Sequence, residues 1–197
     1  MKEIVTALVI VGSLLLSGCA HQIQLNPKTD GLQISENMIN KAVGYHISEV
    51  DRLKKVTTPG GGGDKVSYTP YKDIETALYT VLSNKFSDVY QVKSLEDKAF
   101  IKDNAIELVF LPRIETNSSS SSLVTWPPTK FTINLFCKAI DAEGNTVWEK
   151  EISSEGKAEF SEFKSDYSLA ARRATEKLFT QLADELEAYD NFILNKD

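Results

Sequence analysis

The fold is decided by the stretch Phe131-Thr132-Ile133-Asn134-Leu135-Phe136-Cys137-Lys138-Ala139-Ile140. Every second residue from Phe131 to Ala139 is apolar or small, which is the period of a strand with one buried face. A second strand is expected at residues 146–153, after a turn in which Gly144 and Asn145 tolerate positive φ. The sequence therefore predicts a β-hairpin with Cys137 on its buried face.

Two amphipathic helices are expected to pack on this sheet. One covers residues 71–86, and the other begins with a cap at Ser165 or Asp166 and runs to residue 189. Four further strands are expected at residues 32–39, 42–50, 89–92 and 105–115. Pro112 lacks a backbone N–H, so it places the last of these at a sheet edge or a bulge. The sequence predicts an α+β fold, in which a mainly antiparallel sheet is packed by two amphipathic helices.

Length and charge set limits on the function. The 197 residues carry a net charge of -6, with 42% hydrophobic and 25% charged residues. This composition is that of a globular chain of one domain. The acidic balance argues against a nucleic-acid partner and against broad electrostatic attachment to anionic lipid.

The N-terminus has the features of a secretory signal. An apolar run from Ile4 to Leu16 would form a helix of about 20 Å, too short for a hydrocarbon core of about 30 Å. The run ends in Leu16-Ser17-Gly18-Cys19, which resembles a bacterial lipobox. The resemblance implies a signal peptide over residues 1–18, cleavage before Cys19 and lipid attachment at Cys19. The other interpretation is an ordinary signal followed by a buried cysteine.

The lipobox also suggests a location and an organisation. Ala20 follows the cysteine where inner-membrane lipoproteins carry Asp, so the resemblance favours the outer membrane of a Gram-negative bacterium, with the domain in the periplasm. Several acyl chains on one residue would make the anchor permanent. We expect residues 19–31 to form a lipidated tether and residues 32–197 to form the domain.

No catalytic or metal-binding motif is recognisable. Gly60-Gly61-Gly62-Gly63 is followed by Asp64 and lacks the lysine of a P-loop, so a surface loop is expected there. His46 is expected to face solvent, and Cys137 to lie in the core. The sequence therefore predicts a protein without enzymatic activity, cofactor or metal, although a metal-free acid–base enzyme stays open as an alternative.

One connection has an unusual composition. Residues 118–122 are five serines, and Trp126-Pro127-Pro128 follow before the next strand. Tryptophan beside two prolines makes a stiff, apolar element of the kind that anchors protein partners. We therefore treat Trp126, Pro127 and Pro128 as candidate partner contacts; the alternative is a strand connection whose tryptophan folds back on the domain.

The order of these features resembles that of the YajG-type family of bacterial outer-membrane lipoproteins. The resemblance rests on residues 16–19, 74–86, 90–92, 132–140, 144–145, 155–160 and 191–193. It implies a lipoprotein of the cell envelope and supplies no catalytic residues.

Two functions follow as hypotheses. In the first, the protein is a lipid-anchored accessory or assembly component of an envelope complex, with a protein partner and room for a homo-oligomer. In the second, it is a periplasmic lipoprotein that binds a lipid or glycan in an apolar pocket lined by aromatic residues of residues 131–140 and by Trp148.

Overall fold

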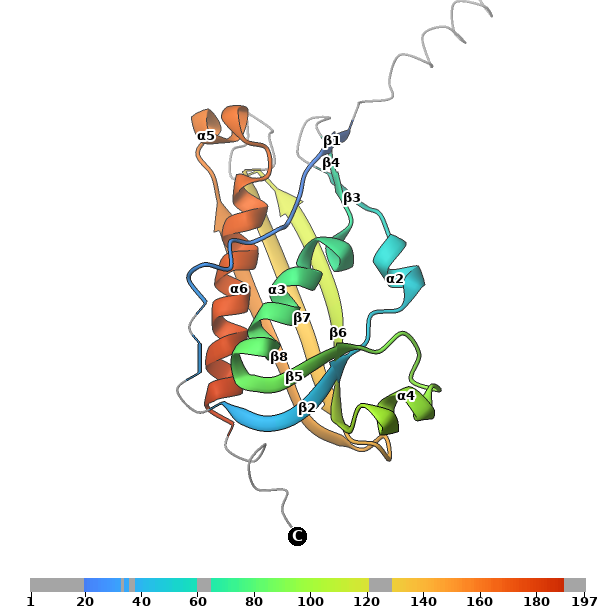
Figure 1. The fold of residues 1–197 in the computed structure, drawn as a ribbon. Helices are drawn as coiled ribbons and strands as arrows, with labels where there is room; N and C mark the ends of the chain where they lie inside the picture. Colours follow the sequence, from blue (N-terminus) through green and yellow to red (C-terminus); the bar gives the residue numbers. More distant parts are fainter. Residues whose placement is uncertain (1–19, 33, 36–37, 60–64, 121–128, 190–197) are drawn as a thin grey trace, which may run out of the picture.

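The computed structural model describes residues 20–32, 34–35, 38–59, 65–120 and 129–189. Two sheets and two long helices organise this part of the chain (Figure 1). The larger sheet has the strand order β5-β2-β6-β7-β8, and the smaller sheet has the order β1-β4-β3.

The predicted hairpin lies in the antiparallel half of the larger sheet. Strands β6 (Ile106–Ser119), β7 (Lys130–Ile140) and β8 (Thr146–Lys157) pair antiparallel in chain order. Gly144 has φ 91° in the turn between β7 and β8, the left-handed conformation that glycine adopts readily. The pairing of β6 with β2 ends at Phe110, two residues before Pro112. At Pro112, β6 is paired only with β7, through Cys137, and its other side is an edge of the sheet. The missing N–H falls on this edge.

The other half of the larger sheet is parallel, which corrects the expectation of a mainly antiparallel sheet. Strand β2 (Ile39–Tyr45) pairs in parallel with both β5 (Phe86–Gln91) and β6. A helix precedes each of the strands parallel to β2: α3 (Pro70–Lys85) precedes β5, and α4 (Lys98–Asp103) precedes β6. These helices allow the chain to enter each strand from the same end of the sheet. The fold is therefore α+β, as expected, with mixed sheets.

Helices α3 (Pro70–Lys85) and α6 (Leu169–Glu187) lie next to one another on one face of the larger sheet (Figure 1). Their buried stripes follow the predicted spacing and pack on the inward residues of β7, including Cys137. The start of α6 differs from the expectation: Asp166 ends the short helix α5 (Phe160–Ser165), and Ser168 is the residue before α6.

Several local elements also differ from the sequence predictions. Residues 42–50 are not one strand, because Ser48 accepts a hydrogen bond from the backbone N–H of Asp51 and starts helix α2 (Glu49–Leu53). Within the expected strand at residues 32–39, only Ile39 belongs to a described strand. The smaller sheet, formed by β1 (Ala20–Gln22), β4 (Lys65–Tyr68) and β3 (Val56–Pro59), was not predicted. Residues 60–64, which include the four glycines, lie outside the described residues.

Candidate functional site

The residues proposed from the sequence for anchoring and docking lie outside the described residues. Cys19 and the segment Trp126-Pro127-Pro128 are therefore placed only through their neighbours. Ala20 begins β1, and Ser119 pairs with Lys130 at the end of the β6–β7 hairpin. These two positions lie at the same end of the molecule (Figure 1), where Thr58 Oγ1 of β3 and Ser118 Oγ of β6 are 2.5 Å apart.

Residues 20–32, the N-terminal strap, pack against the body of the protein. Ile23 and Leu25 are 3% and 0% exposed. The backbone N–H of Leu25 donates to Asp73 Oδ2 of α3 at 3.2 Å, and its carbonyl accepts from Thr175 Oγ1 of α6 at 2.7 Å. Both side chains belong to the main core, within the residues 19–31 that were expected to form a tether.

Backbone groups of the strap that cross α6 also have partners. The N–H of Gln24 donates to Ser168 Oγ at 3.1 Å, and the N–H of Lys28 donates to Glu176 Oε1 at 3.2 Å. Both hydrogen bonds are exposed to solvent, and they follow the path of the strap across the helix. Residues 24–28 thus lie against α6.

A buried lysine links α3 to α6 and to Ser35, which follows the strap in the chain. Lys85 at the end of α3 has a side chain that is 6% exposed, and its Nζ donates to Glu187 Oε2 of α6 at 2.8 Å. Ser35 Oγ donates to the same carboxylate oxygen, and the two hydrogen bonds hold the pKa of Glu187 below its ordinary value. A hollow of about 200 Å³ adjoins these residues between the two helices. Lys85, Glu187 and Ser35 are bonded to one another, so the arrangement joins α3, α6 and residue 35.

A second polar cluster lies at the carboxyl ends of β2 and β5. One oxygen of Glu75, Oε1, accepts hydrogen bonds from Tyr45 Oη at 3.1 Å, Arg52 Nη2 at 2.7 Å and Gln91 Nε2 at 3.1 Å. Burial and the nearby Glu75 carboxylate raise the pKa of Tyr45 above its ordinary value. No sequence motif links these residues, which come from four separate elements.

The topology makes this second cluster a position of interest. The connection from β2 to β5 contains α3, which packs with Phe110 in the main core. The connection from β5 to β6 contains α4, which packs in a separate cluster with Val109. Val109 and Phe110 are successive residues of β6, so the two helices lie on opposite faces of the sheet. Neighbouring parallel strands whose connections leave on opposite faces commonly form ligand sites at their carboxyl ends. In this protein, the hydrogen bonds of Glu75 at these carboxyl ends link α2, α3, β2 and β5.

We expect Glu75→Ala to lower the free energy of unfolding by about 1–3 kcal/mol, because three donors would lose their shared acceptor. Glu49→Ala is the matched control, since Glu49 is 3.9 Å from the same Arg52 but its side chain is 76% exposed. Urea unfolding of both variants measures the difference. Equal and small effects would show that the cluster is not structural.

The remaining cysteine and the histidines have internal contacts. Cys137 is buried, and burial raises the pKa of its thiol to about 12. His46 was expected to face solvent but is half-buried, with Nδ1 2.7 Å from the Val92 carbonyl oxygen. His21 stacks on Tyr167, with ring centroids 4.4 Å apart. Among the described residues, no group of three or more His, Cys, Asp or Glu side chains could hold a metal ion.

We expect Cys137 to resist thiol reagents in the folded protein at mildly alkaline pH, since the reactive species is the thiolate. The same reagent should modify it completely after unfolding in guanidinium. Counting modified thiols by mass spectrometry with and without denaturant checks this. Rapid modification of the native protein would place Cys137 at an accessible site instead.

Of the aromatic residues expected to line a ligand pocket, Phe131 and Trp148 are buried in the core. Phe131 packs edge-on against Tyr68, and Trp148 packs against Phe110, with centroid distances of 5.3 Å and 6.0 Å. On the opposite face of the sheet, a shallow hollow of about 690 Å³ includes Phe136, whose ring is covered by the Arg113 guanidinium at 3.9 Å. In the part of the chain that the structure covers, no helix is both long and apolar enough to cross a membrane.

Comparison with known proteins gives the following results. No family model matches the chain, and no curated protein matches it. Among solved structures, it is similar to the PelC dodecamer from Paraburkholderia phytofirmans, with 11% identity, a TM-score of 0.45, and coverage of 79% of this chain and 95% of that chain. It is similar to a neuraminyllactose-binding hemagglutinin homologue from Helicobacter pylori, with 13% identity, a TM-score of 0.42, and coverage of 86% and 93%. A lipoprotein from Caulobacter crescentus has 12% identity, a TM-score of 0.32, and coverage of 52% and 80%.

Proposed function

We propose that the protein is a lipid-anchored, non-enzymatic accessory or assembly component of a cell-envelope complex. In this proposal Cys19 carries the lipid, the anchor is in the outer membrane of a Gram-negative bacterium, and the domain is in the periplasm. Trp126, Pro127 and Pro128 contact a protein partner. The family resemblance to YajG-type lipoproteins is part of the same proposal.

The resemblance of residues 16–19 to a lipobox is the observation that carries the anchor proposal. β1 begins at Ala20, one residue after Cys19, and pairs with β4 from that first residue. A lipid on Cys19 would therefore be attached one residue before a paired strand.

The partner proposal is supported by where the candidate docking segment leaves the sheet. Its flanking residues, Ser119 and Lys130, form a pair at the end of the β6–β7 hairpin. In the cluster around Glu75 and in the cluster around Glu187, the polar groups form hydrogen bonds with other groups of the same cluster. This supports a role in contact rather than in chemistry.

The anchor is tested by comparing the full-length protein with Cys19→Ser in a Gram-negative host. We expect the parent protein to appear in the outer-membrane fraction, with a mass increase on the Cys19 peptide that corresponds to acylation. Cys19→Ser should lose the added mass and remain unprocessed or leave that fraction. An unmodified Cys19 peptide from the parent protein would contradict the proposal.

The partner is tested by purifying the lipidated protein from gently solubilised membranes. A protein recovered in stoichiometric amount should be reduced at least several-fold by Trp126→Ala, since aromatic anchors at interfaces commonly contribute about 2 kcal/mol or more. Tyr79→Ala is the control, because Tyr79 is an exposed aromatic residue of α3. Unchanged recovery with Trp126→Ala would contradict the docking role, and a bound lipid or glycan in place of a protein would support the ligand-binding alternative.

A further inference from the structure

An exposed aromatic and basic group, the anchor-side patch, is formed by Phe160, Lys164, Tyr167 and His21. Phe160 and Tyr167 are 51% and 41% exposed. Lys164 Nζ lies 5.3 Å from the centre of the Phe160 ring. Tyr167 packs against the buried Phe163 on one side and stacks on His21, with centroid distances of 5.0 Å and 4.4 Å.

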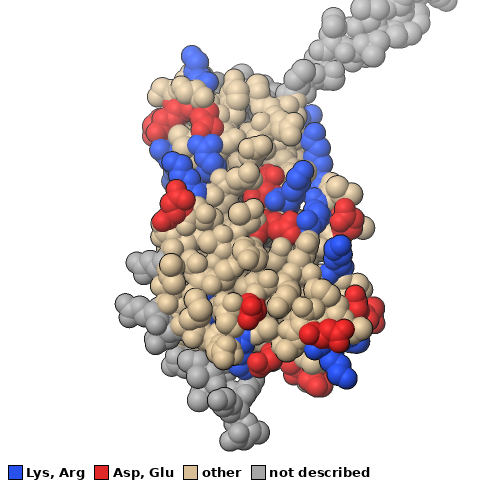
Figure 2. All heavy atoms as spheres, in the orientation of Figure 1, with Lys and Arg blue, Asp and Glu red and all other residues tan. Residues whose placement is uncertain are grey.

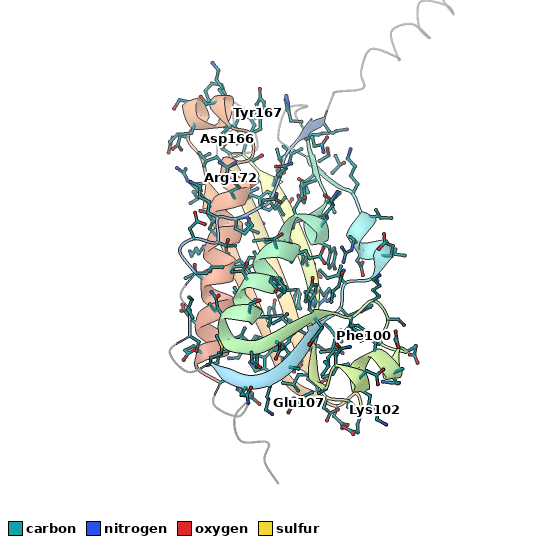
Figure 3. All side chains as sticks on the ribbon, in the orientation of Figure 1. Phe100, Lys102, Glu107, Asp166, Tyr167 and Arg172 are labelled. Atoms are coloured by element: carbon teal, nitrogen blue, oxygen red, sulfur yellow. The ribbon has the colours of Figure 1, made fainter. Side chains whose placement is uncertain are left out.

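The position of the patch is fixed relative to the N-terminus of the fold. Tyr167, Asp166 and Arg172 lie at the end of the molecule where β1 begins, whereas Phe100, Lys102 and Glu107 lie at the opposite end (Figure 3). His21 is two residues from Cys19, so their Cα atoms are at most about 8 Å apart. Because the strap is packed rather than free, a lipid on Cys19 would start beside the patch.

The chemistry of the patch is that of residues at a membrane interface. Aromatic side chains are enriched at the level of lipid headgroups, and lysine places its stem along apolar surface while its charge stays in water. Charges of both signs surround α5 (Figure 2). The acidic ones include Glu162 and Asp166, which are paired with Arg173 and Arg172. The patch is therefore suited to apolar contact with the interface rather than to electrostatic attraction.

We propose that the anchor-side patch lies on the phospholipid surface that carries the lipid anchor, with Phe160 and Tyr167 at headgroup level. This orientation rests on the lipidation of Cys19 proposed above. It places the end of β6 and the start of β7, which flank the candidate docking segment, on the membrane side, and the β7–β8 turn at the distal end (Figure 1).

Two labelled variants of the lipidated protein test the orientation. Lys164→Cys places a thiol in the patch, and Lys102→Cys places one at the opposite end on another exposed lysine position. The native thiols do not interfere, because Cys137 is buried and Cys19 would be acylated. Each variant is labelled with a fluorophore and reconstituted in vesicles of phosphatidylethanolamine and phosphatidylglycerol that contain brominated phospholipid.

We expect quenching by brominated lipid to be roughly twofold or more greater at position 164 than at position 102, as for groups at headgroup level. Adding Phe160→Ser and Tyr167→Ser should reduce the quenching at 164, whereas Tyr79→Ser on α3 should not. Thermal unfolding confirms that each variant is folded.

Mass spectrometry of the Cys19 peptide separates the two proposals. If Cys19 is not acylated, the proposed function fails before the orientation is measured. If Cys19 is acylated and both positions are quenched equally, or position 102 is quenched more, the orientation is overturned. Quenching at 164 that is unchanged by the aromatic substitutions would overturn the role of Phe160 and Tyr167.

Discussion

Gly156→Ala is expected to lower the free energy of unfolding by about 2–3 kcal/mol, because it overpacks a contact between backbones. A Cβ atom at Gly156 would meet the carbonyl oxygen of Ala170 and would lie 2.5 Å from the backbone nitrogen of Ala174. Both atoms belong to α6, so neither can move as a flexible side chain would. The helix would have to shift away from β8, and the hydrogen bond from Ser154 Oγ to the Ala174 carbonyl would be strained.

Gly31→Ala is the matched control for this substitution. A Cβ atom at Gly31 would meet no heavy atom within 4 Å, so the free energy of unfolding should change little. Urea denaturation followed by circular dichroism measures both variants. Equal stabilities for the two variants would show that α6 and β8 are not in backbone contact at Gly156.

Leu25→Ala is expected to lower the free energy of unfolding by about 3 kcal/mol, since it removes a fully buried side chain from the main core. The result distinguishes a packed strap from a tether, because a leucine in a free tether contributes almost nothing to stability. The measurement is again urea denaturation, carried out on unlipidated protein so that membrane binding does not contribute.

Leu53→Ala is the control for Leu25→Ala. Leu53 lies in α2 and is 68% exposed, so its truncation should change the stability by less than about 0.5 kcal/mol. If Leu25→Ala has an effect as small as that of Leu53→Ala, the strap does not form part of the core, and the fixed orientation proposed for the anchor-side patch loses its basis.

The elements that could be predicted are those with a strong local period. Alternation along residues 131–140 indicated β7 and the burial of Cys137, and the three-to-four spacing of apolar residues indicated α3 and α6. Pro112 was placed correctly at an edge because a missing N–H has a direct structural consequence. No local signal in the sequence reveals that α6 passes against the backbone of Gly156.

Other features depend on contacts between distant residues. The parallel pairing of β2 with β5 and β6 is set by the path of the connecting helices, and a strand's own sequence carries little information about it. Ile23 and Leu25 are only two apolar residues in a polar segment. Two residues do not establish an alternating pattern, so the sequence did not indicate that they are buried. The Glu75 cluster joins residues 45, 52, 75 and 91, and the Lys85–Glu187 pair joins residues about a hundred positions apart. Neither arrangement has a sequence motif.

The path of the strap also has a consequence for the order of folding. Leu25 bonds to Thr175, and Lys28 bonds to Glu176, across sequence separations of 150 and 148 residues. Such contacts close very long loops, and loops of this kind form late in folding. The contacts of the strap with α6 therefore form only after the last helix is available, whereas its pairing with β4 needs only the first third of the chain.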